Sequence, residues 1–197
     1  MAKKVVKEAK SAKKPAAVKR AAAKIVRKPA KRATVARRMG PQPVATAAPS
    51  WVEDHIAILQ LLHKYCHAVD RGTAEEVAQL FHVDGVLLPR FESDERYEGR
   101  AAVQEWYARY MENFRAKVRY LRHKIESPVI ELNGHEATSV CYLDADSITL
   151  SSNIANVAFG RYDDKLIKDG GRWFFKERTI IVYYRYPLAM YYEGRGV

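Results

Sequence analysis

The sequence predicts an α+β domain in which three helices pack on one face of a curved, mainly antiparallel sheet, preceded by a disordered basic tail. Apolar residues recur every three or four positions early in the aromatic-rich part of the chain and every second position later, as in helices followed by strands. All Trp, Tyr and Phe of the 197 residues lie after residue 50. Residues 1–50 hold 15 of the 34 Lys and Arg but one of the 23 acids, a formal +14 against −3 for the remainder. We therefore expect a tail and linker over residues 1–48 and a domain over 49–197.

The first helix is expected from Trp51 to Asp70. Ser50 is placed to cap it, with Glu53 completing a capping box, and Arg71-Gly72 ends it. Its apolar side should hold the residues at three- and four-residue steps: Val52, Ile56, Leu59, Leu62, Cys66 and Val69.

Two shorter helices and a run of strands follow. Thr73 is a cap for a helix over 74–81, and a third helix is expected over 101–114. Asn133-Gly134 and Gly170-Gly171 are hairpin signals, whereas Asp163-Asp164 is typical of a strand end. The expected strands are residues 86–89, 119–125, 129–132, 137–147, 156–167 and 173–186.

The tail has the Lys, Ala and Pro composition of a segment that cannot bury a core. It resembles the tails of linker histones and bacterial histone-like proteins, which implies non-specific binding of DNA or RNA by counterion release. A solubilising tail and a cleaved transit peptide are the alternatives. The residues expected to contact nucleic acid are Lys13, Lys14, Lys19, Arg20, Lys24, Arg27, Lys28, Lys31, Arg32, Arg37 and Arg38.

Several other classes find no support in the sequence. It has no apolar run long enough to cross a membrane and no secretory apolar segment. Cys66 and Cys141 are too far apart in sequence for a metal motif, and two lone thiols suit buried positions in a reducing compartment. No glycine-rich phosphate loop is present, so we expect no cofactor. A cytoplasmic location is expected, with association with the nucleoid as an option that the tail leaves open.

A set of short motifs carries a family resemblance. In order along the chain they include Asp70-Arg71-Gly72, Asp84-Gly85-Val86, Tyr97-Glu98-Gly99-Arg100, Gly160-Arg161-Tyr162-Asp163-Asp164 and Gly171-Arg172-Trp173. Over about residues 51–185 their order and spacing resemble a SnoaL-like domain of the NTF2-like superfamily. The resemblance implies a cone-shaped α+β fold with a pocket for a small molecule, and a homodimer. It also implies a cofactor-independent lyase, isomerase or cyclase, although other members of the superfamily have no chemistry.

Asp70 and His123 match the positions at which dehydratase-like members place an Asp that orients a His. The resemblance implies that His123 moves a proton, and Tyr65 matches an oxyanion-binding Tyr. The alternative is that Asp70 caps a turn while His123 and Tyr65 only pack. Residues 143–147 lack the second His of the dehydratases, and Pro89 replaces the Asp of the ketosteroid isomerases.

Three further residues are candidates for the pocket. His63 shares the expected apolar side of the first helix, and its i, i+4 spacing to His67 is insufficient to predict a metal site. Asp144 and Asp146 share one face of a strand, directed either into the pocket or to solvent. The run Tyr183–Tyr186 could cover the pocket mouth or a dimer face. Two functions therefore stand: an acid/base enzyme, or a non-catalytic binding or dimerisation module that the tail tethers to nucleic acid.

Overall fold

The computed structural model describes residues 51–189. The tail, the cap at Ser50 and the expected domain boundary lie outside this part of the chain. No helix within residues 51–189 is both long and apolar enough to cross a membrane. The elements are α1 (Trp51–Arg71), α2 (Ala74–Ala78), β1 (Phe81–Pro89), β2 (Tyr97–Glu98), α3 (Arg100–Asn113), the 3-10 turn η1 (Arg115–Lys117), β3 (Val118–Asn133), β4 (Glu136–Thr149), β5 (Ala155–Asp169) and β6 (Arg172–Pro187).

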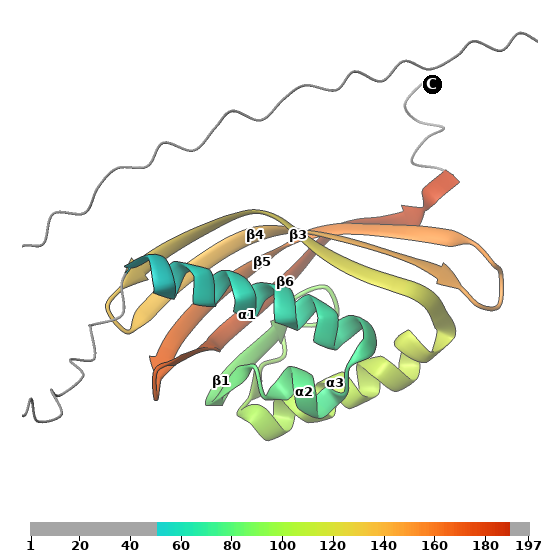
Figure 1. Ribbon diagram of the computed structural model, residues 1–197. Coiled ribbons are helices and arrows are strands. Elements are labelled where there is room, and N and C mark those ends of the chain that lie inside the picture. Colours follow the sequence, from blue (N-terminus) through green and yellow to red (C-terminus); the bar gives the residue numbers. More distant parts are fainter. Residues whose placement is uncertain (1–50, 190–197) are drawn as a thin grey trace, which may run out of the picture. The chain divides into compact units, whose positions relative to one another are not determined.

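The six strands form one curved sheet in the order β2-β1-β6-β5-β4-β3. Only β1 and β6 pair in parallel, and every other neighbouring pair within the described sheet is antiparallel. Helix α1 crosses one face of the sheet, and α2 and α3 lie next to each other near β1 (Figure 1). The predicted α+β class is confirmed.

The buried side of α1 differs from the predicted one. Val52 and Ile56 are each 53% exposed, whereas Leu61 and Tyr65 face the sheet. The stripe is turned because Tyr65, which apolar periodicity does not count, packs its ring in the core and hydrogen-bonds through its hydroxyl. The buried residues of α1 are Ile58, Leu61, Leu62, Tyr65, Cys66 and Val69.

Helix α2 begins as predicted and ends earlier. The Thr73 hydroxyl accepts from the Glu76 amide at 3.1 Å, and the Glu76 carboxylate accepts from the Thr73 amide at 2.7 Å, so the cap is a capping box. The expected helix over 74–81 is wrong at its end: Phe81 opens β1 and pairs with Phe175 of β6. Burial of Phe81 in the sheet outweighs its place in a helical pattern.

Strands β3 and β6 depart from regular pairing at places that matter for the site. The two strands predicted over 119–132 are one long strand, β3, whose register shifts where Ser127 has φ 49°. In β6, Val182 pairs with Gly160 but Tyr184 pairs with Phe159, so Tyr183 is an extra residue. A Cβ on Gly160 would lie 2.1 Å from the Ile181 carbonyl oxygen, which requires glycine there.

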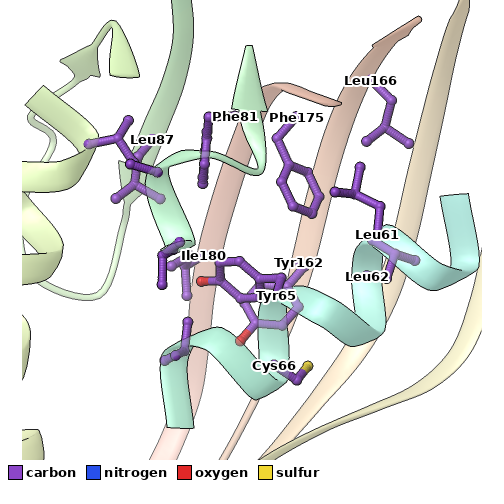
Figure 2. Packing of buried hydrophobic residues seen from close by; sticks show 14 of the residues in the cluster. Leu61, Leu62, Tyr65, Cys66, Phe81, Leu87, Tyr162, Leu166, Phe175 and Ile180 are labelled. Carbon is purple, nitrogen blue, oxygen red and sulfur yellow. The ribbon is translucent and has the colours of Figure 1, made fainter. Parts of the chain in front are cut away.

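The core lies between α1 and the sheet. Figure 2 shows the Tyr65 ring beside Tyr162, and the Phe81 and Phe175 rings near them. The thiols of Cys66 and Cys141 are buried and free, as predicted, and burial raises the pKa of Cys66 to about 11.

The first turn of α1 is tied to the β5–β6 hairpin. The Asp54 carboxylate accepts from the Lys168 ammonium at 2.5 Å and from the Trp173 indole at 2.8 Å. This contact joins the start of α1 to the sheet, and the buried residues of the helix hold the rest of it there.

Candidate active site

A cavity of about 900 Å³ lies between α1, α3 and the concave face of the sheet. Helix α1 contributes Tyr65 and Val69, and α3 contributes a row of aromatic side chains. The remaining walls come from β3 to β6 and from the segment that follows β1. This volume suits a molecule of drug-like size or smaller.

The structure brings Asp70 and His123 together at the wall of this cavity. The imidazole Nδ1 of His123 lies 2.6 Å from Asp70 Oδ1, and the His123 amide donates to both carboxylate oxygens at 3.1 Å. The side chain of Asp70 is 14% exposed and that of His123 is 11% exposed, and His123 lines the cavity. A carboxylate on Nδ1 fixes the tautomer that carries the proton there and leaves Nε2 with a free lone pair. Within residues 51–189, Nε2 has no hydrogen-bond partner.

Tyr65 lies at the same cavity but bonds to another tyrosine. Its hydroxyl is 2.5 Å from the Tyr107 hydroxyl of α3, and both rings are buried. Burial raises the pKa of Tyr65 and of Tyr107, so both keep their protons. One hydroxyl donates to the other, and the second proton of the pair has no acceptor in the described chain. The pair therefore has one O–H group left that can donate a hydrogen bond to a ligand in the cavity.

A buried ion pair supports Tyr65 from behind. Arg178 Nε and Nη2 donate to the two Asp164 oxygens at 2.7 and 2.8 Å, and Ser139 donates to the same carboxylate at 2.9 Å. The guanidinium carbon lies 3.9 Å from the centre of the Tyr65 ring and 4.2 Å from that of Tyr162. Burial alone would lower the pKa of Arg178, but Asp164 outweighs it and holds that pKa well above its usual range.

This ion pair corrects one sequence-based expectation. Asp163-Asp164 does not mark a strand end but lies within β5, and Asp164 is buried. The reason is the partner, Arg178, which stands fourteen residues later on β6 and cannot be inferred from local pattern.

The three further pocket candidates lie in different places, and the expectation for one of them is wrong. His63 is exposed and does not line the cavity, because the buried stripe of α1 runs through Leu62 and Cys66 instead. Asp144 and Asp146 project from the outer face of β4, opposite the inward Leu143 and Ala145. Asp146 borders the cavity, but its carboxylate binds Arg122 at 2.8 and 3.0 Å. The Asp144 carboxylate lies 3.9 Å from the Lys124 ammonium.

The segment Tyr183–Tyr186 divides between two faces. Arg185 and Tyr186 line the cavity, whereas Tyr183 and Tyr184 are each 49% exposed. The sequence reasoning missed the aromatic wall of α3, formed by Trp106, Tyr107 and Tyr110. Their i, i+1, i+4 spacing was the available signal.

Metal chemistry has no visible ligand set in this region. Across the described residues, no group of three or more His, Cys, Asp or Glu side chains could hold a metal ion. The Nδ1 of His67 instead lies 2.7 Å from the Arg71 guanidinium.

Known structures share this fold. A protein provisionally assigned as a scytalone dehydratase from Novosphingobium aromaticivorans superposes with a TM-score of 0.60 at 21% identity, over 68% of this chain and 87% of that one. A hexachlorocyclohexane dehydrochlorinase, LinA-type3, from Novosphingobium barchaimii superposes with a TM-score of 0.59 at 15% identity, over 70% of this chain and 92% of that one. A protein with a cystatin-like fold from Nostoc punctiforme superposes with a TM-score of 0.55 at 22% identity, over 68% of this chain and 92% of that one.

Sequence comparison assigns the family. No curated protein matches the sequence significantly. The family model of the SnoaL-like domain matches residues 51–179, which include α1, the Asp70–His123 pair and most of the sheet. The fold, the cavity and this match together place the chain in the SnoaL-like domain family.

Proposed function

We propose that the protein is a cofactor-independent lyase or isomerase that removes a proton from carbon in a small molecule. The observation that carries this proposal is the 2.6 Å contact between His123 Nδ1 and Asp70 Oδ1 at the wall of the cavity. Two of the similar structures are named for eliminations, one provisionally as a scytalone dehydratase and one as a dehydrochlorinase, and an elimination includes such a proton transfer.

Each group has a role that follows from its geometry. His123 Nε2 accepts the proton, and Asp70 holds the imidazole in place and stabilises the imidazolium that forms. When the proton lies next to a carbonyl, negative charge develops on the carbonyl oxygen. The spare O–H of the Tyr65–Tyr107 pair donates to that oxygen, in a cavity whose apolar walls strengthen the interaction.

Hydrogen exchange tests this proposal directly. We expect the protein to accelerate exchange of the C1 protons of 2-tetralone in D2O, followed by proton NMR, with a rate that saturates in 2-tetralone. The variant His123→Gln should return to the background rate. His63→Gln is the matched control, because it makes the same change on the exposed side of α1 and should behave as wild type. Equal rates in wild type and His123→Gln, for 2-tetralone and for a panel of cyclic ketones, would contradict the proposal.

We also propose that the basic tail binds nucleic acid, since 15 basic residues and one acid lie in residues 1–50 while the rest of the chain is net acidic. This activity is compatible with the first, or stands alone if the cavity only binds a ligand. Residues 51–189 carry no comparable excess of positive charge.

The salt dependence of binding tests the tail. We expect duplex DNA to bind the full chain with a logarithmic salt slope of about −0.9 per phosphate neutralised. Changing the eleven predicted contact residues between Lys13 and Arg38 to Gln should remove most of this binding. Fluorescence anisotropy measures both, and an unchanged affinity in the Gln variant would refute a role for the tail.

A further inference from the structure

One row of residues runs across the sheet from the base to a cation. His123 of β3 pairs with Ala145 of β4, Ala145 with Ala158 of β5, and Ala158 with Arg185 of β6. All four residues line the cavity. The row spans three interstrand spacings, about 14 Å between the outer backbones. Because its two middle members are alanines, the floor between His123 and Arg185 is free of bulky side chains.

Arg185 faces the cavity because of the extra residue in β6. Val182 faces inward, so regular alternation would place Tyr184 inward and Arg185 outward. The extra residue Tyr183 reverses the alternation, and Arg185 shares the inward face with Ala158. This local irregularity places Arg185, which is also exposed to solvent, on the face of the sheet that lines the slot ending at His123.

Arg185 lines the cavity without a carboxylate partner, whereas the Glu92 carboxylate, which also lines it, accepts from the Trp106 indole at 3.0 Å. Arg90, which also lines the cavity, binds Asp94 at 3.1 Å, and the Asp146 carboxylate binds Arg122. No carboxylate between residues 51 and 189 lies within 4.0 Å of the Arg185 guanidinium. A neutral ligand that fills the slot would strip water from this charge without replacing it, whereas a carboxylate would accept two parallel N–H bonds.

The walls of the slot fit a flat ring. The Trp106 and Tyr110 rings are stacked, with centroids 5.6 Å apart, and Phe91 lies edge-on to Trp106 at 6.3 Å. All three residues line the cavity. Burial, Tyr65 and Asp70 raise the pKa of Tyr110, whereas Arg115 and Arg185 oppose this rise, so its hydroxyl keeps its proton.

We propose that Arg185 binds the carboxylate of an aromatic acid whose ring lies over Ala145 and Ala158 and whose far end meets His123. The proposal rests on the proposed function only in naming that acid as the substrate class. The Asp70–His123 pair is net negative while His123 is neutral, so it repels a carboxylate and leaves one orientation favoured.

Binding, measured separately from catalysis, tests the anchor. Isothermal titration of the full chain with 2-naphthoate and with the neutral 2-naphthamide should show tighter binding of the acid. Arg185→Met should weaken the binding of 2-naphthoate by about 10- to 100-fold and leave the binding of 2-naphthamide unchanged. Arg185→Lys should recover part of the loss. Arg109→Met is the matched control, since Arg109 binds Glu105 on the exposed side of α3 and does not line the cavity.

A steric variant tests the slot without touching charge. Ala158→Leu should weaken the binding of both ligands, because the larger side chain fills the floor between Arg185 and His123. Equal binding of acid and amide, an Arg185→Met affinity equal to wild type, or binding of neither ligand would overturn the anchor. These outcomes are separate from the 2-tetralone experiment: exchange that depends on His123 but not on Arg185 leaves the proposed function standing while the anchor fails.

Discussion

Replacing Arg178 with methionine is expected to lower the free energy of unfolding by about 3–5 kcal/mol, the usual cost of removing one member of a buried ion pair. The substitution leaves the Asp164 carboxylate buried with Ser139 as its remaining side-chain donor. The cation that covers the Tyr65 and Tyr162 rings is lost as well. The total free energy of unfolding of domains of this size is about 5–15 kcal/mol, so the loss is a large fraction of their stability.

Urea unfolding followed by circular dichroism measures this effect. The double variant Arg178→Met/Asp164→Asn removes the stranded charge and should recover a substantial part of the loss. If Arg178→Met does not fold, the double variant still carries the test, because it is expected to fold. A double variant as unstable as the single one would show that packing on the rings, and not the isolated carboxylate, causes the loss.

Asp70→Asn is expected to slow the proton transfer by about 10²- to 10⁴-fold while leaving the fold intact. The Asn amide can donate to His123 Nδ1, which favours the tautomer with its proton on Nε2. In that tautomer Nε2 faces the cavity as a donor and no longer accepts a proton. Exchange of 2-tetralone measures the rate.

Nitrogen NMR of the His123 ring distinguishes this mechanism from a packing defect. At alkaline pH the wild-type ring should carry its proton on Nδ1, and the Asp70→Asn ring should shift towards the Nε2–H form. Asp144→Asn makes the same chemical change on the outer face and should alter neither rate nor tautomer. A full exchange rate in Asp70→Asn would remove Asp70 from the mechanism.

Local chemistry made part of the structure predictable. The capping box at Thr73 depends on residues three apart, and the turn at Gly170-Gly171 depends on two glycines, which have φ 53° and 78°. Asp70 and His123 are 53 residues apart, and only the family resemblance placed them in one site.

The remaining features depend on long-range pairing. Local pattern places Asp164 at a strand end, whereas in the fold it lies within β5, where Arg178 of β6 binds it. Local pattern places His63 at the cavity. In the fold the buried side of α1 includes Tyr65, whose hydroxyl bonds to that of Tyr107, and His63 is exposed. Both outcomes depend on contacts between elements that are far apart in the sequence, which local pattern does not show.

The extra residue in β6 also limits how this site can change over time. Deleting Tyr183 would leave Tyr184 opposite Phe159 and Arg185 opposite Ala158, so the cationic end would survive the loss of this residue. A shift in which Tyr183 itself pairs with Phe159 would instead turn Arg185 outward and bring Tyr184 over the slot. A one-residue change of register at this point would therefore exchange a cationic end for an aromatic one, with no substitution in the core. Lineages that share the base at His123 can thus diverge in ligand polarity through strand register alone.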